Sequence, residues 1–176
     1  MEYLNHTQIL RPVGQLLESL RIDSFAITMD AEGVVIRDKT RNRAQVTPRE
    51  RAFLAELESH HSGSEGKVQA RRLAEGVLEW RLGWADIERL EREGQSQRRR
   101  SGQAPDANSL PQILRVLGGV VDQKRGQLLS ISKETEIVRL EYQLSNGQRV
   151  AEEFTMPMLY DHWVRMYKRR DPSGGR

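Results

Sequence analysis

Apolar residues recur every three or four positions near the start of the chain and then alternate with polar residues. The first pattern predicts an amphipathic helix from residue 8 to about residue 21, because this spacing places side chains on one helical face. Its apolar positions after the opening QILR are Val13, Leu16, Leu17 and Leu20. The alternating segment 24–29 predicts a strand. Residues 34–36 predict the returning strand, after a turn in which Gly33 suits a positive φ.

The same order of patterns returns near the end of the chain. Residues 113–121 predict a second amphipathic helix, and residues 127–132, 136–144 and 149–154 predict three strands. The last two strands are joined through Asn146-Gly147, the strongest short hairpin signal. Each strand group is followed by a predicted helix start, at Thr47-Pro48 in the first case and at Thr155-Met156-Pro157 in the second.

Two heptapeptides 104 residues apart share five of their seven residues: QILRPVG at 8–14 and QILRVLG at 112–118. The match of Gly14 with Gly118 closes the heptapeptide, and further matches at this offset are Ile27 with Ile131, Glu32 with Glu136, and Val34 with Val138. We therefore expect the α+β fold class, with two related helix–antiparallel β-hairpin/meander–helix units forming a pseudo-two-fold internal repeat around a helical insert. In that arrangement the two glycines let equivalent helices approach closely. The alternatives are chance similarity between two ordinary amphipathic helices, and two separate lobes.

Changes of composition predict where the parts of the chain begin and end. Residues 1–62 are expected to form the first α-β-β-α repeat, 63–94 the helical insert, and 95–108 a flexible polar and basic linker. Residues 109–170 form the second α-β-β-β-α repeat, and 171–176 a disordered tail. Within the insert, residues 68–82 are predicted to be helical, residues 85–93 continue or restart the helix, and Gly94 ends it.

Composition narrows the class of protein. The chain has 176 residues, of which 37% are hydrophobic and 30% charged, which is typical of a soluble globular protein. The absence of cysteine excludes disulfides, thiolate metal sites and a cysteine nucleophile. We see neither a signal peptide nor a stretch of 18 apolar residues. We therefore expect a cytoplasmic protein without a membrane partner.

No motif for catalysis or for a cofactor is present. The sequence lacks G-x-S-x-G, the P-loop and G-x-G-x-x-G, and its four histidines do not have metal-ligand spacing. Asp161-His162 beside Tyr160 is a weak acid–base candidate, because adjacent helical residues point about 100° apart. We expect a protein that is not an enzyme, with no catalytic, cofactor or metal residues and no small-molecule substrate. The alternative is a catalytic site that is assembled only when the chain folds.

Protein interaction is the first functional hypothesis. Exposed strand edges accept strands from partners, and aromatic residues are favoured interface anchors. The candidate interface residues lie on the apolar stripe of the insert: Leu73, Val77, Trp80 and Trp84. The sequence thus favours an interaction or assembly module whose partner is another protein or a second copy of this chain in a homodimer. The alternative is that these tryptophans complete the core.

Nucleic-acid binding is the second functional hypothesis, because Lys and Arg contact phosphates and aromatic rings stack on bases. The candidate polyanion-binding residues form three clusters: Arg37, Lys39, Arg41 and Arg43; Arg98, Arg99 and Arg100; and Arg165, Tyr167, Lys168, Arg169 and Arg170. A more specific version of this hypothesis is a helix-turn-helix over residues 73–90. The acidic residues of its second helix argue against it, because they would face the phosphates. Basic residues also suit helix C-termini and solvated loops.

The two hypotheses differ in the surface they require. Basic clusters that converge on one face, with Tyr167 among them, favour nucleic acid. Scattered clusters and an exposed apolar patch around Trp80 favour protein interaction.

Overall fold

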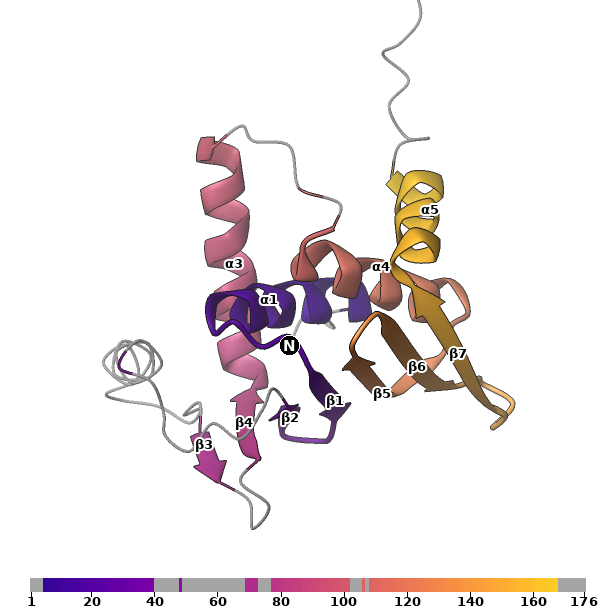
Figure 1. Cartoon of the computed structure of the whole chain (residues 1–176), viewed down its shortest axis with the longest axis horizontal. Helices are drawn as coiled ribbons and strands as arrows, with labels where there is room; N and C mark the ends of the chain where they lie inside the picture. Colours follow the sequence, from indigo (N-terminus) through magenta and orange to yellow (C-terminus); the bar gives the residue numbers. More distant parts are fainter. Residues whose placement is uncertain are drawn as a thin grey trace, which may run out of the picture.

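The computed structural model of the chain describes residues 5–39, 48, 69–72, 77–101, 106 and 108–167. In this part of the chain one antiparallel sheet of seven strands, in the order β3-β4-β2-β1-β5-β6-β7, is combined with helices (Figure 1). The elements are α1 (His6–Ser19), β1 (Phe25–Met29), β2 (Gly33–Asp38), β3 (Gln69–Arg72), β4 (Leu78–Gly83), α3 (Trp84–Ser101), α4 (Leu110–Gln123), β5 (Gln127–Glu134), β6 (Ile137–Gln143), β7 (Arg149–Thr155) and α5 (Met156–Tyr167). The predicted α+β class is confirmed.

The helices and strands predicted at the two ends of the chain are present close to their expected bounds. The helix predicted from residue 8 to about residue 21 is α1, and the helix predicted at residues 113–121 is α4. The three strands predicted after it are β5, β6 and β7, and α5 begins directly after β7. The helix predicted to open at Thr47-Pro48 lies outside the described residues except for Pro48.

The helix predicted at residues 68–82 is wrong, because this segment contains β3 and β4. Trp80 has a helical spacing to Val77 and Trp84, but it also alternates with Leu78 and Leu82. The sheet uses the second pattern, and all three residues of the alternating set are buried. β4 finds its backbone partner in β2, where Trp80 lies opposite Ile36. The helix-turn-helix hypothesis for residues 73–90 is therefore also wrong, because its first helix is replaced by β4.

The helix stop predicted at Gly94 is also wrong. α3 continues through Gly94 to Ser101, so the first seven residues of the predicted linker 95–108 are helical. Gly94 is buried where α3 approaches α1, and a Cβ atom added to it would lie 2.8 Å from the side-chain oxygen of Gln15. The glycine therefore allows two helices to approach and does not end one.

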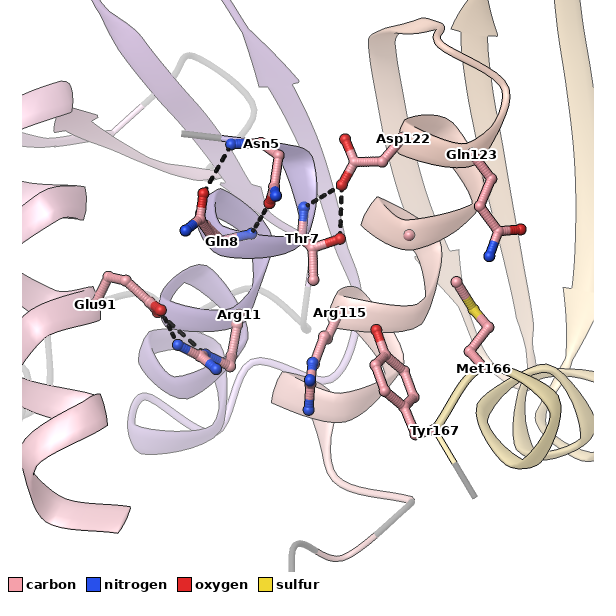
Figure 2. A pocket seen from close by; sticks show the side chains of 11 residues that line it. Asn5, Thr7, Gln8, Arg11, Glu91, Arg115, Asp122, Gln123, Met166 and Tyr167 are labelled. Carbon is pink, nitrogen blue, oxygen red and sulfur yellow. Dashed lines mark hydrogen bonds and ion pairs between the residues drawn. The ribbon is translucent and has the colours of Figure 1, made fainter. Parts of the chain in front are cut away.

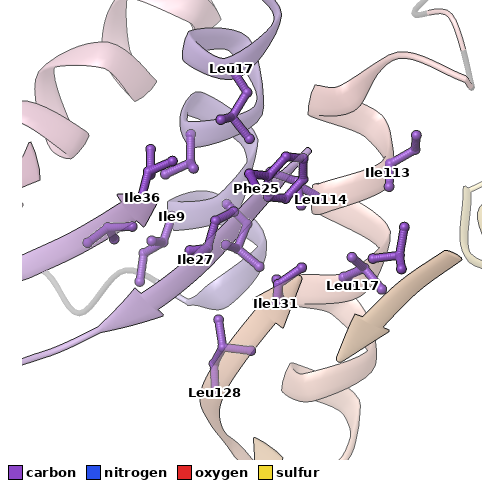
Figure 3. Close-up of a cluster of buried hydrophobic side chains, with 14 of the residues drawn as sticks. Ile9, Leu17, Phe25, Ile27, Ile36, Ile113, Leu114, Leu117, Leu128 and Ile131 are labelled. Carbon is purple, nitrogen blue, oxygen red and sulfur yellow. The ribbon is translucent and has the colours of Figure 1, made fainter. Parts of the chain in front are cut away.

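The core is one cluster of apolar side chains contributed by the helices and the sheet. Leu17 of α1 and Leu114 of α4 lie close to Phe25, Ile27 and the strands β1 and β5 (Figure 3). The expected close approach of α1 and α4 is confirmed. A Cβ atom on Gly14 would lie 2.6 Å from Pro111 Cα, and one on Gly118 would lie 2.7 Å from the carbonyl carbon of His6.

Bounds and pairings recur along the chain at fixed offsets. α1 and α4 have 14 residues each and start 104 positions apart. Ile27 pairs with Ile36 in the first half, and Ile131 pairs with Leu140 in the second. After each helix one residue has a positive φ, 56° at Arg21 and 51° at Arg125. In helix bounds, strand pairing and backbone conformation, these residues therefore match those 104 positions later.

Candidate functional site

A cavity of about 400 Å³ opens where four helices meet (Figure 2). Its lining residues come from the start of α1 (Asn5, Thr7, Gln8, Arg11), from α3 (Glu91), from α4 (Arg115, Gly119, Asp122, Gln123) and from α5 (Met166, Tyr167). Most of these side chains are polar or charged. The cavity is therefore suited to a polar ligand.

The start of α1 is closed by a reciprocal cap. The backbone N–H of Gln8 donates to the side-chain oxygen of Asn5 at 2.9 Å, and the backbone N–H of Asn5 donates to Oε1 of Gln8 at 3.0 Å. Because both partners are N–H donors, the side-chain atoms facing them must be oxygens. The NH₂ groups of both amides are thereby left as donors, with no hydrogen bond from either to another described residue.

Asp122 of α4 caps the same helix from outside. Its carboxylate accepts from the backbone N–H groups of His6 and Thr7, both at 3.0 Å, from the Thr7 hydroxyl at 2.6 Å, and from Nδ1 of His6 at 2.8 Å. Partial burial raises the pKa of Asp122, but the hydrogen bonds from His6 and Thr7 outweigh it and lower the pKa below 3.8. The carboxylate is therefore ionised and fully engaged at the positive end of α1.

The His6 ring joins this cap to the sheet. Its Nε2 accepts from the backbone N–H of Leu128 at 3.3 Å, while Nδ1 faces Asp122. This pair of contacts requires the tautomer with hydrogen on Nδ1. One side chain thus links α1, α4 and β5.

Arg11 and Glu91 form a buried ion pair between α1 and α3. Nε of Arg11 donates to Oε2 of Glu91 at 3.0 Å, and Nη2 contacts Oε1. The side chains are only 13% and 5% exposed. The paired geometry matches the fork of a guanidinium to the two oxygens of a carboxylate, so the charge of Arg11 is compensated.

Arg115 occupies the position in the second heptapeptide that Arg11 occupies in the first, 104 residues earlier. Its environment is different. The guanidinium carbon lies 4.1 Å from the ring centroid of Tyr167, a cation–π contact with α5. Nε is buried without a hydrogen-bond partner, and no ion pair joins Arg115 to another described residue. The uncompensated positive charge of the cavity therefore lies at Arg115.

The structure places the predicted basic clusters in two regions. Arg98, Arg99 and Arg100 lie in the C-terminal part of α3, while Arg165 is exposed near the end of α5 and Tyr167 lines the cavity. α3 and α5 both run away from the strands, so their C-terminal ends lie on the same side of the molecule (Figure 1). Lys168, Arg169 and Arg170 lie outside the described residues.

The remaining basic cluster does not join the cavity. Arg37 of β2 pairs with Glu79 at 3.1 Å, and Lys39 pairs with Glu134 at 2.8 Å. Arg41 and Arg43 lie outside the described residues. The described part of this cluster is therefore neutralised by carboxylates along the sheet.

The structure does not support the predicted interface around Trp80, because Trp80 is fully buried in the core. Trp84 is half-buried and donates from Nε1 to the carbonyl of Ala31 at 2.9 Å. Val77 is also half-buried, and Leu73 lies outside the described residues. The large apolar residues that are exposed were not predicted: Ile137, Met158 and Tyr160, at 48%, 46% and 41%.

The weak acid–base candidate is not assembled into a site. His162 packs edge-on against Phe154 with ring centroids 5.5 Å apart, and Tyr160 stacks on Trp163. Among the described residues, no three His, Cys, Asp or Glu side chains gather in a way that would hold a metal ion. None of the described helices is both long and apolar enough to span a bilayer.

The sequence analysis missed Arg115, Asp122 and the two amides of the cap. One signal for Arg115 was present, since it ends the repeated QILR segment. The spacing Asn5-x-x-Gln8 was a second signal, because it is a capping-box pattern. Asp122 had none, because its partners are 115 and 116 residues away in the chain.

No protein-family model, no curated protein and no solved structure matches this chain.

Proposed function

We propose that the protein is a non-enzymatic module that binds nucleic acid on the side where α3 and α5 flank the cavity. The observation that carries this proposal is the state of Arg115, a guanidinium that faces a polar cavity and has no carboxylate partner among the described residues. A half-buried cation without a counterion among the described residues attracts anions, so a polyanion is a natural partner. A cytoplasmic location belongs to the same proposal and is compatible with the lack of cysteine.

The two flanking helices support the same partner. α3 carries three consecutive arginines near its end, and α5 presents the exposed Arg165 in its last turn. A strand of nucleic acid that crosses the cavity would run between these two helices. Phosphate contacts of this kind give affinity without base specificity.

Fluorescence anisotropy of labelled single-stranded and duplex oligonucleotides, over a series of salt concentrations, tests the proposal. We expect affinity to fall steeply as salt rises. The variant Arg165→Glu, and the triple variant Arg98→Glu, Arg99→Glu and Arg100→Glu, should both weaken binding and lower the salt dependence. Arg149→Glu, on the exposed edge strand β7, has the same change of charge as Arg165→Glu and is its control. Absence of binding at low salt, or an equal loss in the control, would contradict the proposal.

We also propose that the two halves of the chain are copies of one helix–sheet–helix unit. The helix bounds and strand registers that recur at an offset of 104 support this interpretation. On this view Arg11 and Arg115 are equivalent residues that now have different partners. The two copies have the same backbone arrangement. The proposed binding site lies at Arg115, where the partners of the second copy differ from those of the first.

Protein interaction is the second candidate function, now at a different surface. Ile137 lies opposite Thr155 of β7, and α5, which carries Met158 and Tyr160, begins at the next residue. These three exposed apolar side chains lie at the end of the described sheet where β7 has β6 as its only strand partner. Sedimentation velocity over a range of concentrations tests self-association, and Ile137→Lys should abolish it. A monomer at every concentration would remove the homodimer from consideration.

A further inference from the structure

We infer that the cavity at Arg115 is a binding site for a single phosphate group, which anchors one end or one backbone position of the nucleic acid. This inference rests on the proposed function for its biological ligand. The chemistry that it requires is that of a tetrahedral oxyanion, whether that oxyanion is a terminal phosphate, a backbone phosphodiester or free phosphate.

The acidic residues of the cavity already have partners. Asp122 accepts four hydrogen bonds from the start of α1, and Glu91 receives the paired contacts of Arg11. The charge of Glu91 is balanced by Arg11, and the charge of Asp122 is held at the positive end of α1. The negative residues in the lining are therefore compatible with an anionic ligand.

The groups that are left over are donors. The cap uses the oxygens of Asn5 and Gln8, so both NH₂ groups are left to donate. The amide of Gln123 and the guanidinium of Arg115 also line the cavity. Apart from the oxygen of Gln123, the side-chain groups named here that remain available are donors, and a phosphate group offers oxygens without needing to donate.

The comparison of Arg11 with Arg115 shows which ligand would fit. At Arg11 the two-oxygen face of Glu91 satisfies the guanidinium fork. At the equivalent Arg115 no described carboxylate takes this place, and Tyr167 covers one face of the guanidinium plane. A guanidinium held against a ring in this way can still form two parallel hydrogen bonds to an oxyanion along its edge. The phosphate would thus accept the paired hydrogen bonds of Arg115, as Glu91 accepts those of Arg11.

The size of the cavity agrees with a ligand larger than an inorganic ion. Its volume of about 400 Å³ is within the range of small-molecule sites. A phosphate group together with an attached nucleoside therefore fits more naturally than phosphate alone. For this reason we expect a phosphorylated nucleotide end to bind more tightly than inorganic phosphate.

Isothermal titration calorimetry of the full chain tests the inference with three probes. They are inorganic phosphate, a short single-stranded oligonucleotide with a 5′-phosphate, and the same oligonucleotide with a 5′-hydroxyl. Arg115→Met should weaken binding of the phosphate-bearing probe at least about tenfold, as expected for loss of a charge-assisted pair. Gln123→Glu changes an exposed residue of the lining and should weaken binding similarly while leaving the fold intact. Arg149→Met is the matched control and should bind as the unmodified chain does.

The outcomes separate this inference from the proposed function. Tighter binding of the 5′-phosphate form that both cavity variants abolish supports a terminal phosphate. Equal binding of the two oligonucleotides that both variants weaken supports a backbone phosphate. Binding of inorganic phosphate alone supports the site and contradicts the nucleic-acid function. Oligonucleotide binding that neither Arg115→Met nor Gln123→Glu alters overturns the site and leaves the function standing, and no binding of any probe overturns both.

Discussion

Ile27 of β1 lies directly opposite Ile131 of β5 in the central antiparallel pair of the sheet, and both side chains are fully buried. The pairs on either side are Ala26 with Ser132 and Thr28 with Ser130. The register is therefore symmetrical about these two isoleucines, which are 104 residues apart. From this pair the sheet extends through β2 and β4 on one side and through β6 and β7 on the other. The β1–β5 pair thus joins the N-terminal strands of the sheet to its C-terminal strands.

The crossing of α1 and α4 gives the first prediction. Gly14→Ala and Gly118→Ala should each lower the free energy of unfolding by roughly 1–3 kcal/mol, because the added methyl group meets backbone atoms that cannot move aside. Gly94→Ala is the control, since its methyl group would meet only the flexible end of Gln15. Chemical denaturation measures all three. Unchanged stability in the first two variants would show that the helices are not in close contact.

The Arg11–Glu91 pair gives the second prediction. Removing one partner, as in Arg11→Met or Glu91→Leu, should cost roughly 3–5 kcal/mol, because the other charge stays buried and loses its paired contacts. The double variant should be clearly more stable than the sum of the two losses predicts. Urea denaturation of the four proteins measures the coupling. Additive losses would show that the two side chains do not interact in solution.

Asp122 gives a prediction about acid stability. Burial raises the pKa of Asp122, but hydrogen bonds from His6 and Thr7 lower it overall, so the folded pKa lies below that of the unfolded chain. The stabilisation is therefore present above the unfolded pKa near 3.8 and is lost as pH falls through the folded pKa. Asp122→Asn should destabilise the protein by roughly 1–3 kcal/mol at neutral pH, and the difference should shrink below about pH 4. Denaturation at several pH values checks this, with the exposed Asp161→Asn as control. A difference that does not change with pH would contradict it.

Tyr142 gives a prediction at the alkaline end. Burial and its hydrogen bond of 2.5 Å to Glu152 raise the pKa of Tyr142 to about 12. Because the folded pKa is raised, the stabilisation is present below the unfolded pKa near 10 and is lost as pH rises through about 12. The protein should therefore lose stability as the pH rises from about 10 to about 12, and Tyr142→Phe should reduce this loss. Tyr160→Phe, at an exposed site, should leave the loss unchanged. Absorbance at alkaline pH follows the ionisation directly. Ionisation of Tyr142 near pH 10 would contradict the structure.

The candidate site was only partly predictable. Tyr167 was identified from its basic neighbours, and it does line the cavity. Arg115 was visible only as part of a repeated segment, because nothing local distinguishes it from Arg11. The difference between them depends on Glu91, which lies on α3, and on Tyr167, which lies on α5.

Residues 68–82 show a different limit of sequence analysis. Trp80 has apolar neighbours at both helical and strand spacing, so the pattern alone supports two structures. The segment forms a strand and not a helix because the edge of β2 offers backbone hydrogen bonds to β4. Those bonds, together with burial of Trp80 in the core, outweigh the local helical preference of the segment.

The sequence by itself determined the local elements wherever one period dominates. The spacing of apolar residues in α1 and α4, the alternation in β6, and the Asn146-Gly147 turn each leave one way to bury the apolar side chains. The tertiary structure decided which of these elements meet. It placed Asp122 at the start of α1 and Glu91 beside Arg11, and it left Arg115 facing a cavity with Tyr167. Those contacts join residues 52 to 116 positions apart, and such pairings are set by packing of the whole core and not by local pattern.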